Sequence, residues 1–154
     1  MDMVNVKING ADYSVPAGIT VLEACRYANI DIPTLCYLKD INCIGACRVC
    51  VVEVNGHKGL VASCVFPVEE GMEVFTNSPM AREARRANLR LILSEHDTSC
   101  TSCSRSGNCT LQSLANDFNM RGEHYPTKLR REAVDYSTPL IRENDKCVKC
   151  MRSI

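Results

Sequence analysis

Two groups of cysteines in this sequence have the types and spacing of metal ligands. In the first group, a single cysteine is followed after ten residues by a C-x2-C pair and after thirteen more by another cysteine: Cys36, Cys47, Cys50 and Cys64. Four converging thiolates are the ligands that a 2Fe–2S cluster requires. Gly45 and Ala46, just before the pair, would let backbone N–H groups approach the sulfides. Because zinc sites more often use two C-x2-C-like pairs, the pattern favours a 2Fe–2S site.

The second group combines one histidine with three cysteines: His96, Cys100, Cys103 and Cys109. The residue types alone also fit a zinc site with one His and three Cys ligands. We favour a 4Fe–4S cluster, because a one-electron carrier is useful only beside another carrier. A neutral imidazole in place of a thiolate removes one negative charge and favours the reduced state, as in Rieske clusters. A zinc-binding structural or interaction domain that uses the same ligands is the alternative.

The other four cysteines receive different interpretations. Cys25 lies on an apolar helix face and is predicted to belong to the core. Cys43 is predicted to be a free thiol, because its four-residue step to Cys47 does not fit the plant-type C-x4-C-x2-C spacing. Cys147 and Cys150 are interpreted as residual ligands of an incomplete motif. A weak metal site or an oxidation-prone pair is the alternative for these two.

Composition excludes several classes of protein. The 154 residues carry no formal net charge, so the basic excess of a nucleic-acid-binding protein is missing. No stretch approaches the ~18 apolar residues of a membrane span, and the first residues lack the apolar segment of a secretory signal. An odd count of eleven cysteines argues against a disulfide framework. We therefore expect a cytoplasmic, metal-binding protein with neither nucleic acid nor a membrane as partner.

The elements that must position the first ligand group follow an α+β pattern. Residues 3–15 predict a β-hairpin around the turn Asn9-Gly10, because apolar residues alternate on both sides of it. Thr20 and Glu23 form a capping box that predicts a helix to about residue 29. Further strands are predicted at 49–54, 60–62 and 72–74. This order is typical of a compact α+β domain.

The chain becomes helical after residue 79. A long helix is predicted over 80–95, and a short one over 110–119. The apolar face of the long helix is predicted to contain Met80, Ala84, Ala87 and Leu91. A second, solvated face is predicted for Arg82, Arg86 and Arg90. Residues 121–145 are polar, contain two prolines and are predicted to form a linker.

Three stretches carry a resemblance to a known family. They are TLCYLKDINCIGACRVCVVEVNG, ASCVFPVEEGMEVFTNSP and SEHDTSCTSCSRSGNCTLQSLA. Together they resemble the N-terminal region of the iron-only (FeFe) hydrogenases of the multi-cluster, NAD(P)-linked kind. The large peripheral subunit of respiratory complex I and some NAD-dependent formate dehydrogenases share this region. The similarity runs from residue 3 to about 120, with all eight ligands in register.

The resemblance implies a β-grasp 2Fe–2S ferredoxin domain over residues 1–78, then a small helical 4Fe–4S domain over 79–120. A linker and the start of a further 4Fe–4S ferredoxin motif would occupy 121–154. In that motif Ser153 stands where the family has a third cysteine. We expect a fragment, a truncated product or a free-standing subunit that lacks a hydrogen-activating centre. The expected function is to relay single electrons to or from a flavoprotein, a ferredoxin or a hydrogenase-type catalytic subunit.

Overall fold

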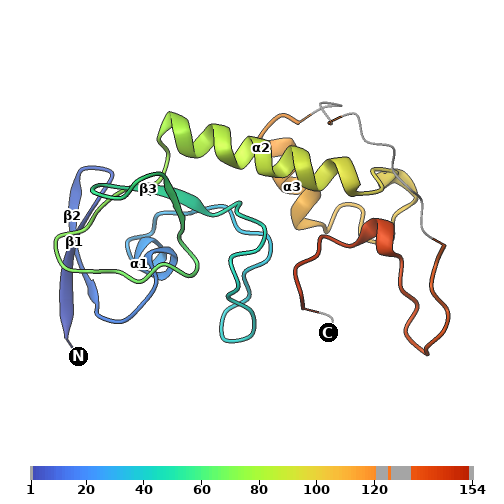
Figure 1. The fold of residues 1–154 in the computed structure, drawn as a ribbon, viewed down its shortest axis with the longest axis horizontal. Helices are drawn as coiled ribbons and strands as arrows, with labels where there is room; N and C mark the ends of the chain where they lie inside the picture. The colour runs from blue at the N-terminus through green and yellow to red at the C-terminus, as the bar shows by residue number, and fades with distance from the viewer. Residues whose placement is uncertain (1, 121–124, 126–132, 153–154) are drawn as a thin grey trace.

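The computed structural model describes residues 2–120, 125 and 133–152 (Figure 1). A mixed sheet with one packed helix forms the N-terminal part. The long helix α2 then extends away from the sheet to a group of short helices and loops. The last described residues return toward the first part of the chain, where they contact residues 35–37.

The N-terminal hairpin forms as its alternating pattern predicts. Strands β1 (Met3–Ile8) and β2 (Ala11–Pro16) pair antiparallel, with Ile8 opposite Ala11. The two turn residues, Asn9 and Gly10, have φ values of 52° and 86°. A two-residue turn with positive φ at both positions is type I′, whose twist matches that of the flanking strands. The predicted turn is confirmed.

Helix α1 (Val21–Tyr27) covers one face of the sheet. Its predicted capping box is present: the Thr20 hydroxyl accepts from the Glu23 amide, and the Glu23 carboxylate accepts from the Thr20 amide. These bonds satisfy amide groups that a helix start otherwise leaves without partners. The helix buries Cys25 completely, so the prediction that this cysteine belongs to the core is confirmed.

Three short strands complete the sheet: β3 (Val51–Val54), β4 (Leu60–Ala62) and β5 (Glu73–Phe75). The strand order is β2-β1-β5-β3-β4. Strand β5 runs parallel to β1 and antiparallel to β3, so it joins the two hairpins at the centre of the sheet. This mixed five-stranded sheet with one covering helix has the predicted β-grasp arrangement.

The long helix α2 (Pro79–Glu95) begins at Ser78, whose hydroxyl accepts from the Ala81 amide. The predicted buried face of this helix is wrong. Met80 is 45% exposed and Leu91 57% exposed. The buried residues are instead Ala81, Arg85, Leu89, Leu93 and Ser94. The buried face was predicted from hydrophobicity alone. Because the true buried face includes an arginine, the apolar residues indicated a face rotated about the helix axis from the true one.

A second apolar core lies under α2. It contains the buried residues Leu35, Val49, Leu89, Leu93, Leu111, Leu114 and Met120. Leu111 and Leu114 come from α3 (Thr110–Asp117), whereas Leu35 and Val49 come from the loop that carries the first ligand group. The core therefore packs the two ligand-bearing regions directly against each other.

The described C-terminal residues contain a short 3-10 helix, η2 (Asn144–Lys146), and an isolated bridge between Asp135 and Arg142. Of the predicted linker over 121–145, residues 121–124 and 126–132 lie outside the described residues. Among the residues that the structure describes, no helix combines the length and apolarity needed to cross a membrane.

The corrected face of α2 gives a paired test of stability. Leu89→Ala should lower the free energy of unfolding by about 2–5 kcal/mol, because it opens a cavity in the second core. Leu91→Ala, on the same helix and 57% exposed, should change it by no more than about 0.5 kcal/mol. Denaturant unfolding of both variants, purified without oxygen, measures the difference. Equal losses would mean that α2 is rotated from the described orientation.

Candidate metal centres

The four thiols of the first group meet in one buried place. Cys36, Cys47 and Cys50 lie on the irregular segment between α1 and β3, and Cys64 follows β4. Cys36, Cys50 and Cys64 are at most 1% exposed, and Cys47 is half-buried. Cys43 lies on the same segment but is exposed. The fold therefore brings the four predicted ligands together and leaves Cys43 outside.

These thiols are arranged as two close pairs. The Cys47 thiol is within hydrogen-bond reach of Cys36, and burial raises the pKa of Cys47. In the other pair, the hydrogen bond from the Cys64 thiol lowers the pKa of Cys50 to about 6. The same bond, together with burial, raises the pKa of Cys64. Charge coupling from Cys36 and Cys47 also reaches Cys64, so all four thiols interact.

Two close thiol pairs suit a binuclear centre, in which each of two irons takes two thiolates. Within the described ranges, no three His, Cys, Asp or Glu side chains converge closely enough to hold a single metal ion. Backbone N–H groups already point at the sulfurs: those of Val49 and Cys64 donate to Cys47 and Cys50. Such donors partly neutralise a thiolate-bound cluster. The residues present therefore fit a 2Fe–2S cluster.

The backbone around the pair is shaped by positive φ angles. Gly45 has φ of 63° and Arg48 has φ of 55°. A Cβ at Gly45 would lie 3.3 Å from a methyl carbon of Val65, which is closer than ordinary van der Waals contact. Both the backbone conformation and the space therefore favour glycine at this position. Ser63, which directly precedes Cys64, donates its hydroxyl to the Cys50 carbonyl at 2.7 Å. This bond holds the backbone of Cys64 near that of Cys50.

The second ligand group gathers where three elements end. His96 is the residue at which α2 stops, Cys100 opens the short helix η1 (Cys100–Ser102), and Cys103 follows it. Cys109 is the N-cap of α3. The Arg105 amide donates to the Cys103 sulfur at 3.4 Å, an N–H···S contact of the kind that cluster loops use. Each ligand position is thus fixed by a helix terminus.

The imidazole of His96 has the properties of a metal ligand. Its Nδ1 atom is buried and has no hydrogen-bond partner among the described residues. Burial lowers the pKa of His96, so the ring is neutral at neutral pH and keeps a nitrogen lone pair. A buried polar atom without a partner is costly in a folded protein. Coordination of iron by this imidazole would give the buried ring a polar partner that the described residues do not supply.

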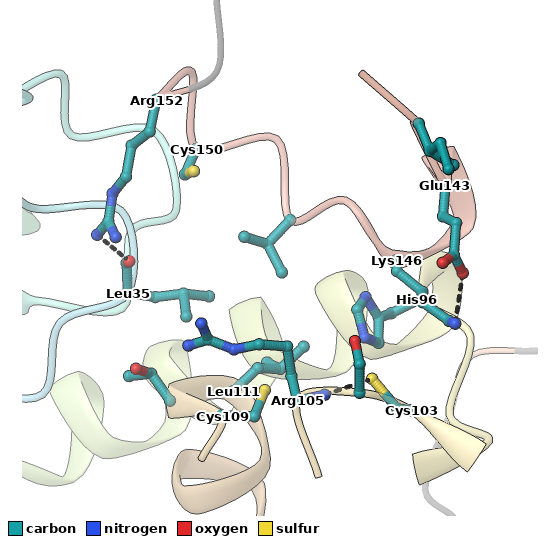
Figure 2. Close-up of a pocket in the computed structure, with 14 residues that line it drawn as sticks. Leu35, His96, Cys103, Arg105, Cys109, Leu111, Glu143, Lys146, Cys150 and Arg152 are labelled. Carbon is teal, nitrogen blue, oxygen red and sulfur yellow. Dashed lines mark hydrogen bonds and ion pairs between the residues drawn. The ribbon is translucent and has the colours of Figure 1, made fainter. Parts of the chain in front are cut away.

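Two adjoining cavities, of about 360 and 340 Å³, surround the second ligand group. His96, Cys109 and Leu111 line both of them. Cys103 lines the first cavity, which Figure 2 shows, and Cys100 lines the other. The four predicted ligands therefore line adjoining cavities, and their residue types fit a 4Fe–4S group.

The C-terminal residues close over the first site and border the second. Arg152 donates to the carbonyls of Leu35, Cys36 and Tyr37 at 2.7, 3.2 and 2.9 Å. The Asn42 amide donates to the Cys36 carbonyl at 3.0 Å and to the Cys150 carbonyl at 2.6 Å. Figure 2 shows Cys150 and Arg152 beside Leu35 at the edge of the cavity.

Cys147 and Cys150 have the local geometry of a cluster loop. The Lys149 amide donates to the Cys147 sulfur at 3.3 Å, as the Arg105 amide does to Cys103. Lys149 and Met151 both have positive φ, 52° and 60°. The C-x2-C pair is thus folded, with Cys150 half-buried and Cys147 exposed.

Comparison with known proteins identifies the N-terminal part. Residues 1–79 match the family described as "2Fe-2S iron-sulfur cluster binding domain". The chain belongs to this 2Fe–2S family. Residues 85–124 match the "NADH-ubiquinone oxidoreductase-G iron-sulfur binding region". This 2Fe–2S family member is therefore an electron-transfer iron–sulfur module with one 2Fe–2S and one 4Fe–4S cluster, as predicted, and the zinc alternative is not supported.

Several subunits of larger redox enzymes are similar to this 2Fe–2S family member over nearly its whole length. The NADP-reducing hydrogenase subunit HndD of Solidesulfovibrio fructosivorans is 45% identical over 99% of the chain and 27% of its own length. The NAD-reducing hydrogenase HoxS subunit gamma of Cupriavidus necator is 34% identical over 98% of the chain and 64% of its own length. A mitochondrial NADH dehydrogenase [ubiquinone] iron–sulfur protein 1 of Solanum tuberosum is also 34% identical, over 99% of the chain and 21% of its own length.

A solved structure agrees with these relatives. A chain of an NAD+-reducing [NiFe]-hydrogenase in the H2-reduced state superposes with a TM-score of 0.87 at 32% identity, over 96% of this chain and 62% of that one. The present chain therefore spans between about a fifth and two thirds of the proteins it resembles. The predicted resemblance to NAD(P)-linked hydrogenases and complex I is confirmed.

Sequence reasoning missed the residues that join the two sites. Leu35 and Val49 each adjoin a predicted ligand, and both belong to the second core. Their position in the sequence next to Cys36 and Cys50 could have indicated that they pack beside the ligands. Asn42 and Arg152 carried no such signal, because their contacts join residues more than a hundred positions apart.

The assignment of the first ligand group can be tested by single substitutions. Cys36→Ser, Cys47→Ser, Cys50→Ser and Cys64→Ser should each remove only the 2Fe–2S signal in electron paramagnetic resonance (EPR), because each leaves one iron with a single thiolate. Cys43→Ser and Cys25→Ser are the matched controls and should leave both signals intact. Loss of the 2Fe–2S signal in Cys43→Ser would make that residue a ligand.

His96→Cys tests the second group. An added thiolate puts one more negative charge on the cluster and should lower the 4Fe–4S reduction potential, while the 2Fe–2S potential stays nearly unchanged. Each 59 mV in a one-electron couple corresponds to about 1.4 kcal/mol, so even a partly screened charge is measurable. Redox titration of both clusters gives the two potentials. An unchanged 4Fe–4S potential in a fully assembled cluster would show that His96 is no ligand.

Proposed function

We propose that this chain relays single electrons between its two clusters as part of, or as an accessory to, an NAD(P)-linked hydrogenase-type oxidoreductase. When bound, each cluster supplies reversible one-electron redox chemistry. The chain's own residues hold the clusters, exclude water and set their spacing. The named activities of the similar hydrogenase and dehydrogenase subunits support this role.

One packing contact supports the relay most directly. Leu35 precedes Cys36 in the sequence and lines the same cavity as His96, Cys103 and Cys109. Leu35 therefore adjoins a proposed ligand of the first cluster and also lines the cavity of the second ligand group. In addition, Cys47 and Cys109 both pack against the second core. Short, apolar, water-free contact between two carriers is what electron transfer between them needs.

We assign the ligands on this basis. Cys36, Cys47, Cys50 and Cys64 hold the 2Fe–2S cluster, and His96, Cys100, Cys103 and Cys109 hold the 4Fe–4S cluster. The boundary between the two domains lies near residue 79, where α2 begins. Cys147 and Cys150 are the first two ligands of a further 4Fe–4S site, an assignment supported by the amide-to-sulfur contact at Cys147.

The proposed partners are those that exchange single electrons, and the proposed location is the cytoplasm. A flavoprotein, a ferredoxin or a hydrogenase-type catalytic subunit would exchange electrons with the chain. All eleven cysteines are unpaired, which suits the reducing conditions of the cytoplasm.

Protein purified without oxygen should contain about six iron and six acid-labile sulfide per chain, the sum of one 2Fe–2S and one 4Fe–4S cluster. Elemental analysis and sulfide assay measure these amounts, and visible absorption provides an independent check. Stoichiometric zinc without labile sulfide would refute the proposal.

The relay itself can be tested by partial reduction. When less than one electron per chain is added, rapid freezing should find it distributed between the clusters according to their potentials. In the fully reduced protein, EPR should show magnetic interaction between the two clusters. Cys64→Ser, which lacks only the first cluster, is the control and should lose that interaction. Two clusters that are present but magnetically independent would contradict the relay.

A further inference from the structure

A buried arginine lies between α2 and the sheet. Arg85 is 4% exposed, although a guanidinium is normally kept in water. Its Nε and Nη2 atoms donate to the Val51 carbonyl at 3.0 and 2.7 Å. Nη2 also donates to the Thr76 carbonyl at 2.7 Å. Val51 directly follows Cys50, so the cation lies against the backbone of the residue next to a proposed ligand.

Within the part of the chain that the structure describes, no salt bridge joins Arg85 to a carboxylate. Its hydrogen bonds within the described ranges all go to neutral carbonyl oxygens. A buried charge is costly unless an opposite charge compensates it. Arginine does not escape this cost by losing its proton, because its pKa in proteins stays far above neutral pH. The compensating negative charge must therefore come from another kind of group.

Two thiols are the ionisable groups that interact with Arg85. Burial lowers the pKa of Arg85, and the thiolate forms of Cys50 and Cys25 raise it. Burial also raises the pKa of Cys25 to about 11, so this thiol is protonated and neutral. Cys50 directly precedes Val51, whose carbonyl accepts from Arg85, so this geometry points to the cluster site as the source of negative charge. With the cluster bound, that charge belongs to the whole thiolate-bound 2Fe–2S group, which is anionic in both oxidation states.

We propose that Arg85 is the buried countercharge of the 2Fe–2S cluster and raises its reduction potential. Reduction adds one electron from the donor and no proton, so the cluster becomes more negative by one charge. A fixed cation in a medium of low dielectric stabilises the reduced state more than the oxidised one. The inference rests on the proposed assignment of Cys50 as a ligand, and it adds a residue that tunes the potential of the first cluster.

The effect should be confined to the first cluster. His96 follows Arg85 by eleven residues on the same helix, which corresponds to about 16 Å along its axis. The second ligand group is therefore much farther from the cation than Val51 and Cys50 are. Its potential serves as an internal control in the same sample.

Redox titration of the loaded, full-length chain tests the proposal. Arg85→Met and Arg85→Gln remove the charge, Arg85→Lys retains it, and Arg82→Gln removes an exposed charge from the same helix. At the wild-type midpoint, the ratio of reduced to oxidised 2Fe–2S should fall at least tenfold in both neutral variants, a shift of about 59 mV. Arg85→Lys should stay within about threefold of the wild-type ratio. Arg82→Gln should leave the ratio of reduced to oxidised 2Fe–2S unchanged. The ratio of reduced to oxidised 4Fe–4S should stay at its wild-type value in all four variants.

Each outcome bears on the proposal. If Arg85→Met or Arg85→Gln has full iron and sulfide content and the wild-type ratio of reduced to oxidised 2Fe–2S, the proposal is overturned. An equal fall in Arg85→Lys would also overturn it, because the hydrogen-bond geometry and not the charge would then be responsible. If only Arg85→Lys retains the cluster, the charge is required for cluster binding, which supports the countercharge role. If Arg85→Lys also loses the cluster, the proposal fails. A wild-type chain without a 2Fe–2S cluster would instead refute the proposed function.

Discussion

The collection of four thiols in a dry interior is the constraint on which the rest of the structure depends. Thiolates that are close together and out of water repel one another, and bound iron removes this repulsion while contributing folding free energy. The segment between α1 and β3 has little regular structure, because its path is set by the ligands it must deliver. Positive φ at Asp40, Gly45 and Arg48 marks where this path bends. The sheet and α1 form the frame that holds both ends of the segment.

The second core converts two neighbouring sites into one unit. Leu35 and Val49 project from the first ligand segment into the same core as Leu89, Leu93 and Leu111. Interiors of this kind are close-packed and deform little, so the separation of the two ligand groups is fixed by side-chain volume. Helix α2 spans both regions, with Arg85 against β3 at one end and His96 at the other.

Local sequence signals were sufficient for much of the fold. The Asn9-Gly10 turn and the Thr20–Glu23 capping box each depend on residues close together in the chain, and each formed as expected. The ligand assignment from the cysteine spacing stays a prediction. The rotation of α2 could not be read in the same way, because burial of Arg85 depends on carbonyls of Val51 and Thr76 that only the folded sheet supplies. The contacts of Asn42 and Arg152 were hidden for the same reason.

The position of β5 has a consequence for synthesis of the chain. This strand contains residues 73–75, yet it lies at the centre of the sheet, between β1 and β3. A chain that leaves the ribosome from its N-terminus therefore exposes all four thiols of the first group before the two hairpins can be joined. Pairing between such distant segments is slow to form. During that interval the ligand segment is open to a donor of iron and sulfide, and insertion of β5 then closes the sheet behind the assembled cluster.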